Sequence, residues 1–291
     1  MATGSTYEDG WYWSADGLRL HYRDYAGDAA RPVLLCLPGL TRSARDFEGL
    51  AERHAGEWRV ICADLRGRGE SAHAKDPLSY VPPTYVQDVQ ALLTAADVER
   101  FAVVGTSLGG VVAMMLAGPM GERLAGAVLN DIGPEIEMAG LERIRGNVGR
   151  SVSWPTWLHA ARDLAARNTG IYPDWSLTDW LVFAKRLCRL TTSGRICFDY
   201  DPRIADAFKL PSQGFDLWPG LEALCRKPVL SLRGALSDVL TAATQARMVE
   251  RCPGLVAVTV PRVGHAPTLD EAPVVAAIDA FLLRIVEETR P

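Results

Sequence analysis

The chain has 291 residues, of which 48% are apolar, enough to build one large hydrophobic core. Its 31 Lys and Arg residues stand against 35 Asp and Glu residues, giving a net charge of -4 without long runs of either sign. This balance excludes a basic surface for nucleic acid. No apolar stretch reaches the roughly 18 residues that a membrane span requires. The expected partners are therefore a small-molecule substrate and water, and the sequence leaves the oligomeric state open.

The N-terminal residues carry the acidic Glu8 and Asp9 and no basic segment followed by an apolar one, so no secretory signal is predicted. The six cysteines are scattered and form no C-x-x-C pair. Free thiols in the reducing cytoplasm are the simplest interpretation. We expect a cytoplasmic protein.

The first predicted element is an antiparallel hairpin that ends near Ala26 and Gly27, because apolar residues alternate along 18–25 after a turn-like segment. Continuously apolar runs then recur, as in strands buried on both faces of a parallel sheet, at 33–37, 60–63, 101–104, 127–129, 228–232 and 256–260. Helical patterns lie between these runs and form a long amphipathic segment at 274–285. Alternating strands and helices predict an α/β fold with a mostly parallel, doubly wound sheet.

This alternation stops after Gly133 and resumes near residue 216. The intervening segment has no buried-strand pattern, and prolines divide it into short helical stretches. We predict a core domain at 1–133 and 216–291 and an inserted helical cap at 134–215. The large apolar residues of the cap are expected to form the ceiling of a substrate pocket, namely Trp154, Trp157, Trp180, Phe183 and Leu187. The cap arginines are interpreted as a solvated face rather than as a carboxylate site.

Ser107 lies in the motif Gly105-Thr106-Ser107-Leu108-Gly109, between a buried strand and an apolar-faced helix. A sharp turn in that setting exposes the serine hydroxyl at the carboxyl edge of the sheet. Serine is a poor nucleophile unless a base adjoins it. His265 follows the last strand and is the predicted base, whereas the other histidines are assigned packing or surface roles.

The base needs a carboxylate that fixes its tautomer. Asp238, after the strand that precedes the histidine strand, is the preferred candidate because it completes the chain order Ser, Asp, His. Asp131, after the 127–129 strand, is the alternative acid. The backbone N–H groups of Leu40 and Leu108 are predicted to form the oxyanion hole. No metal or organic cofactor is expected, because no metal-ligand or phosphate-binding motif is present.

Together these segments resemble the cap-bearing α/β-hydrolase family over essentially the whole chain. The matching pieces are Pro38-Gly39-Leu40, the Asp64–Ser71 segment, the turn around Ser107, Arg233-Gly234 leading to Asp238, and Gly264-His265-Ala266-Pro267. The resemblance implies an acyl-enzyme mechanism with Ser107, Asp238 and His265. Within the Asp64–Ser71 segment, Asp64 and Arg66 are expected to brace the loop.

Two departures from relatives narrow the expected reaction. Pro38-Gly39 replaces the His-Gly of many relatives, and Ala266 stands where carbon–carbon bond hydrolases commonly have Trp. Ser107 argues against dehalogenases and epoxide hydrolases of this fold, which have Asp at that position. The leading hypothesis is hydrolysis of a small, mainly apolar carboxylic ester or lactone. The alternatives are a carbon–carbon bond hydrolase and a non-catalytic binding protein with a retained pocket.

Overall fold

The computed structural model describes residues 6–207 and 214–289. Residues 1–5 and 290–291 of the predicted core domain and 208–213 of the predicted cap lie outside the described residues. No helix in the described ranges is long and apolar enough to cross a lipid bilayer.

Within the described residues, one sheet has eight strands in the order β1-β2-β4-β3-β5-β6-β10-β11. Only the pairings of β1 with β2 and of β2 with β4 are antiparallel. The predicted α/β fold and its N-terminal hairpin are therefore confirmed. The strands are β1 (Glu8–Trp13), β2 (Arg19–Tyr25), β3 (Val33–Leu37), β4 (Val60–Asp64), β5 (Phe101–Thr106), β6 (Leu124–Asn130), β10 (Val229–Gly234) and β11 (Val256–Val260).

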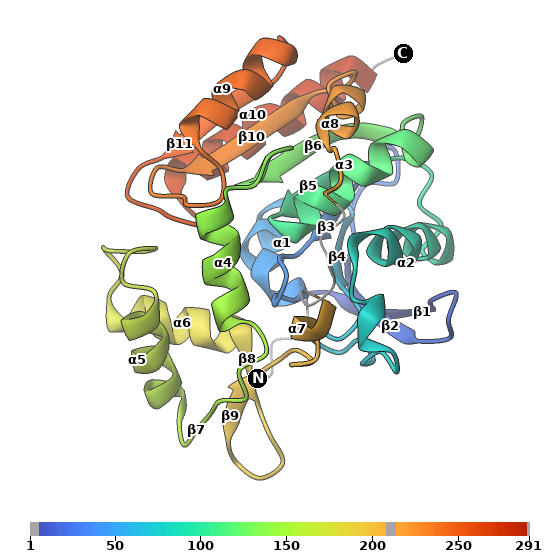
Figure 1. Ribbon diagram of the computed structural model, residues 1–291. Coiled ribbons are helices and arrows are strands. Elements are labelled where there is room, and N and C mark those ends of the chain that lie inside the picture. The colour runs from blue at the N-terminus through green and yellow to red at the C-terminus, as the bar shows by residue number, and fades with distance from the viewer. Residues whose placement is uncertain (1–5, 208–213, 290–291) are drawn as a thin grey trace.

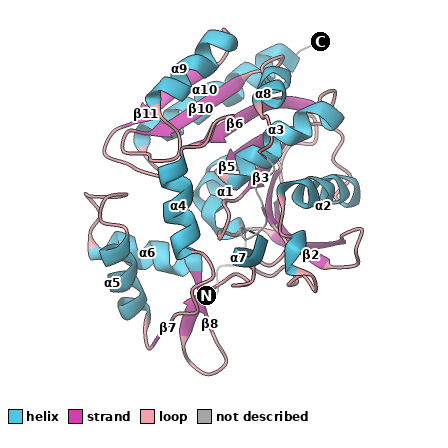
Figure 2. Ribbon diagram, in the orientation of Figure 1, coloured by secondary structure: helices cyan, strands magenta, loops and turns pink. Residues whose placement is uncertain are grey.

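Helices cover both faces of this sheet, because successive side chains of a buried strand point to opposite faces. In β3, Leu35 and Leu37 join one hydrophobic cluster, whereas Leu34 and Cys36 join the other. The first cluster includes α2 (Pro82–Ala95), α3 (Leu108–Met120), α8 (Trp218–Leu224) and α9 (Ala242–Arg251). The second includes α1 (Glu48–His54) and α10 (Ala272–Thr289). Figure 2 shows helices on both sides of the strands.

The insertion after β6 projects from the carboxyl ends of the strands, and α4 leads from the sheet into it (Figure 1). Its helices are α4 (Met138–Asn147), α5 (Trp157–Arg167), α6 (Leu177–Leu187) and α7 (Ile204–Ala207). A three-stranded antiparallel sheet, absent from the sequence prediction, joins β7 (Ser153–Trp154), β8 (Cys188–Leu190) and β9 (Ile196–Phe198) within the described part of the cap. Strands of two or three residues are too short to produce a recognisable alternation, so the pattern predicted helices alone.

Candidate active site

Ser107 occupies a sharp turn between β5 and α3. Its backbone has φ 52° and ψ -113°, a conformation that residues with a side chain rarely adopt. The turn closes because its flanking glycines allow close approach: a Cβ on Gly109 would lie 2.0 Å from the Leu37 carbonyl oxygen, and one on Gly105 would lie 2.6 Å from the Gly109 backbone. The Ser107 amide donates to the Asn130 carbonyl oxygen at 3.0 Å, which ties the turn to the end of β6.

His265 lies on the loop after β11 and reaches across the sheet edge to Ser107. Its Nε2 is 2.9 Å from the Ser107 Oγ. Asn130 donates from Nδ2 to the Pro267 carbonyl oxygen at 2.9 Å, so the end of β6 also holds the histidine loop. The structure thus brings together the predicted nucleophile and the predicted base.

Asp131 is the carboxylate that contacts the imidazole. Its Oδ2 lies 2.7 Å from the His265 Nδ1 and also accepts from the Ser237 hydroxyl at 2.6 Å. Its Oδ1 accepts from the Gly234 amide at 2.7 Å. The side chain is fully buried, so these donors replace the water that a carboxylate would otherwise require.

Asp238, the preferred acid of the sequence prediction, does not contact His265 in the structure. Its carboxylate instead forms a paired contact with the Arg143 guanidinium of α4, with Nη2 to Oδ1 at 2.7 Å. This arginine lowers the pKa of Asp238 below its ordinary value, and 36% of the side chain is exposed. The assignment is corrected for a physical reason: Asp238 is engaged by a cation at the surface, whereas Asp131 is buried against the imidazole.

The predicted oxyanion donors belong to two separate segments, the loop after β3 and the start of α3. Leu108 is the first residue of α3, and Leu40 lines the same cavity as Ser107 and His265. Among the described residues, no hydrogen bond occupies the amide of Leu40 or Leu108. Arg68 donates from Nε to the Leu40 carbonyl oxygen at 2.8 Å, which holds the Leu40–Thr41 peptide next to the Leu40 amide.

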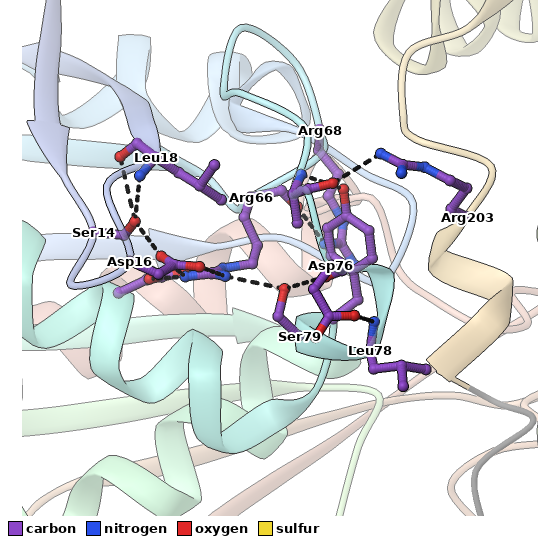
Figure 3. A network of polar contacts seen from close by, with 12 residues as sticks. Ser14, Asp16, Leu18, Arg66, Arg68, Asp76, Leu78, Ser79 and Arg203 are labelled. Atoms are coloured by element: carbon purple, nitrogen blue, oxygen red, sulfur yellow. Dashed lines mark hydrogen bonds and ion pairs between the residues drawn. The ribbon is translucent and has the colours of Figure 1, made fainter.

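A buried polar network braces the segment that carries Arg68. Arg66 donates to both carboxylate oxygens of Asp88, at 2.6 and 2.7 Å, and to Asp16. Figure 3 shows Arg66 between Asp16 and Ser79. The Asp64 carboxylate accepts from the Ala44 amide at 2.7 Å, as expected for a bracing residue. The predicted bracing roles agree with these contacts.

The cavity above Ser107 has a volume of about 180 Å³ and is lined in part by residues of the cap. Of the five predicted pocket residues, Phe183 lines it and Leu187 lines an adjoining cavity. Trp154, Trp157 and Trp180 line neither, which corrects that part of the prediction. The lining also includes large side chains that the sequence did not single out: Arg42, Phe47, Ile144, Val148, Tyr172, Arg186 and Leu269.

The cap tryptophans pack the cap itself. Trp180 is 4% exposed and packs edge-on against Tyr172 and Trp175, with ring centroids 5.9 and 4.8 Å away. Trp154 packs edge-on against Phe198 at 5.1 Å. The periodicity of a short amphipathic helix identifies its apolar face but not whether that face meets a cavity or another helix.

The cap also contacts the histidine loop directly. The Gly264 amide donates to the Ile171 carbonyl oxygen at 2.7 Å, and the Tyr172 hydroxyl donates to the Ala266 carbonyl oxygen at 2.6 Å. Burial raises the pKa of Tyr172, so its hydroxyl remains a donor at physiological pH. The cap therefore helps to hold the loop that presents His265.

Nucleophilic hydrolysis requires a hydroxyl, an imidazole and a carboxylate joined in series by hydrogen bonds. The site at the Ser107 turn contains all three groups. Residues 34–278 match the model of the alpha/beta hydrolase family, and the chain belongs to that family. Among solved structures, it resembles an alpha/beta hydrolase from Novosphingobium aromaticivorans DSM 12444, with 54% identity, a TM-score of 0.93, and coverage of 96% of this chain and 99% of that one.

Among curated proteins, it resembles a 3-hydroxybutyrate-oligomer hydrolase of Cupriavidus necator, with 34% identity over 90% of this chain and 92% of that protein. A putative hydrolase from Rickettsia typhi has the same fold, with a TM-score of 0.83 at 24% identity over 95% of this chain and 98% of that one.

Proposed function

We propose that this protein hydrolyses a small carboxylic ester, or a lactone, through an acyl-enzyme formed on Ser107. The observation that carries the proposal is the continuous contact from the Ser107 Oγ through the His265 imidazole to the Asp131 carboxylate. In this mechanism Asp131, rather than Asp238, orients the imidazole.

In the first half-reaction, the Ser107 oxygen attacks the ester carbonyl while the His265 Nε2 takes its proton. The tetrahedral oxyanion accepts hydrogen bonds from the Leu40 and Leu108 amides. As the carbon–oxygen bond breaks, His265 returns the proton to the leaving alcohol. Water then attacks the acyl-enzyme by the same route and releases the acid. The reaction consumes one water and needs no metal or organic cofactor.

Two observations support an ester over the alternatives. The curated relative that matches nearly the whole chain is named as a hydrolase of 3-hydroxybutyrate oligomers. An oligomer of a hydroxy acid is joined by ester bonds. The cavity at Ser107 is small, and apolar side chains such as Leu40, Phe47 and Leu269 contribute to its wall. The cytoplasmic location remains a prediction from the sequence.

A hydrolysis profile across p-nitrophenyl esters, lactones and vinylogous diketones tests this proposal. We expect the purified protein to turn over short esters, and Ser107→Ala to reduce kcat on the order of 10⁴-fold or more because the three side chains act as a unit. Ser193→Ala, on an exposed turn of the cap, is the matched control and should retain full activity. Full labelling of Ser107→Ala by a fluorophosphonate probe, or faster turnover of diketones than of every ester, contradicts the proposal.

A further inference from the structure

A second cavity, also about 180 Å³, lies beneath the cap beside the catalytic one. The two cavities share Thr41, Arg42, Ile144, Val148 and Phe183, so they adjoin along a common wall. The sequence alone assigned the cap arginines to a solvated face. The structure instead places Arg143, Arg150 and Arg167 on the wall of the second cavity, together with Arg42 from the core domain.

The charges on this wall are all of one sign. Among the described residues, four arginines and no acidic side chain line the cavity, and Asn147 and Asn168 add amide groups. The carboxylates that pair with three of these arginines stand outside it: Asp46 pairs with Arg42, Asp238 with Arg143, and Asp163 with Arg167. The cavity itself therefore presents an excess of cationic donors.

These pairings do not use all of the donors. Arg42 and Arg143 bind their carboxylates through Nε and Nη2, which leaves both Nη1 groups outside the pairs. Arg167 uses Nε alone. Arg150 has no carboxylate partner among the described residues, and its Nε donates to the Gly146 carbonyl oxygen at 2.8 Å. An anion that enters this cavity meets guanidinium groups with N–H bonds that these carboxylates do not use, and charge-assisted donors of this kind bind a carboxylate more strongly than neutral donors do.

Apart from Thr41 and Tyr200, the rest of the wall is apolar, with Ile144, Val148, Val152, Leu164, Phe183, Leu187 and Phe198. The Arg42 guanidinium lies 4.3 Å from the centroid of the Phe183 ring, at the boundary between the two cavities. A ligand that spans them therefore needs a reactive group at Ser107, a short apolar stretch, and an anionic end.

We propose that the physiological substrate is a short ester that also carries a free carboxylate, which the arginine-lined cavity binds while Ser107 acts on the ester bond. This inference rests on the proposed esterase function and refines its substrate class, adding a negative charge to the mainly apolar ester expected from the sequence. Hydroxy acid oligoesters and monoesters of dicarboxylic acids both have this chemistry, and they differ in whether the carboxylate belongs to the leaving group or to the acyl group.

Two pairs of probes test the charge of the substrate while its shape stays nearly the same. One pair is the linear dimer of 3-hydroxybutyrate and the same dimer with its terminal carboxyl converted to a primary amide. The other pair is mono-p-nitrophenyl glutarate and the corresponding p-nitrophenyl glutaramate. We expect kcat/KM to favour the carboxylate over the amide by about tenfold or more in at least one pair, mainly through KM.

Arg150→Gln should reduce this carboxylate preference by about fivefold. Arg150→Lys should reduce it less, because lysine keeps the positive charge but lacks the planar guanidinium group. Arg162→Gln is the matched control, since it removes the same charge from an exposed position on α5 that lines neither cavity. Equal turnover of carboxylate and amide in both pairs, or an equal effect of Arg150→Gln and Arg162→Gln, overturns the inference but leaves esterase function standing. If the protein hydrolyses none of the four probes and no neutral ester, the proposed function itself is overturned.

Discussion

The two sides of the catalytic cavity are built differently. On the sheet side, each reactive group follows the end of a strand and is fixed through the backbone: the Ser107 amide donates to Asn130, and the Gly234 amide donates to Asp131. On the cap side, Phe183, Arg143 and Arg167 extend from short helices and are held by contacts between side chains. The difference suggests that the chemistry is anchored rigidly while substrate choice depends on contacts that single substitutions can change.

The largest effect on the sheet side is expected from the acid. Asp131→Asn should reduce kcat on the order of 10³ to 10⁴-fold, because an amide at this position stabilises the wrong imidazole tautomer. Asp238→Asn is the matched control, since it alters an equivalent side chain that pairs with Arg143 instead, and it should reduce kcat far less. Steady-state kinetics with a short p-nitrophenyl ester measure both. A larger loss from Asp238→Asn would return the role of orienting acid to Asp238.

On the cap side, we expect selectivity for acyl length. Neutral p-nitrophenyl esters of about two to six acyl carbons should exceed the twelve-carbon ester in kcat/KM by about tenfold or more, because a cavity of about 180 Å³ gains from each methylene only until it is full. Phe183→Ala should move the optimum to longer chains by enlarging the cavity. Leu158→Ala, a partly exposed cap position, should leave it unchanged. A kcat/KM that rises steadily through twelve carbons would show that the cap does not limit the site.

The hydrogen bond between Tyr172 and the Ala266 carbonyl oxygen joins the two sides. Tyr172→Phe keeps the ring that stacks on Trp175 at 3.7 Å but removes this bond. We expect kcat to fall about three- to tenfold, as one hydrogen bond is worth roughly 1 kcal/mol, with little change in KM. Tyr22→Phe in β2 serves as the control. An unchanged kcat would mean that the cap does not position His265.

The smallest effect concerns stability alone. His21 is buried between Asp64 and Asp9, at 2.7 and 2.9 Å. Burial lowers the pKa of His21, but the two carboxylates outweigh burial and raise it above its ordinary value. Its charged form therefore stabilises the fold below about pH 6.5, and this contribution is lost as the pH rises through the raised pKa.

His21→Gln should consequently lower the free energy of unfolding by roughly 1 kcal/mol more at pH 6 than at pH 9, measured by urea denaturation. The preference among substrates should not change, because His21 lines neither cavity at the cap. An equal destabilisation at both values of pH would contradict a charged His21 in the folded protein.

Much of the sheet side could be predicted because its signals are local. The buried run Val33–Leu37 coincides with β3, and the motif around Ser107 occurs where a strand meets a helix. A continuous apolar run of only five residues between turn residues favours a buried strand, because helices are usually longer. His265 was identifiable for the same reason, as a residue on the loop that follows the last strand.

The choice of acid depended on information that is not local. Both Asp131 and Asp238 stand between Ser107 and His265 in the chain, so chain order cannot separate them. Sheet order separates them, because β6 lies beside β5 whereas β10 lies one strand further away. The cap tryptophans pose the same difficulty: which side of Trp180 meets a cavity depends on how α6 packs against Tyr172 and Trp175.

The contact between the cap and the histidine loop limits how freely the cap can be exchanged for that of a relative. A cap is attractive to protein engineers as an exchangeable part that carries specificity. Here, however, a Cβ added at Gly264 would lie 3.0 Å from the Ile171 Cα, so the loop and the cap are fitted backbone to backbone. A chimera that imports another cap would need to retain the segment around Ile171 and Tyr172, or it would alter the base together with the selectivity. Recombination within this family should therefore succeed more often when the cap and the His265 loop are inherited together.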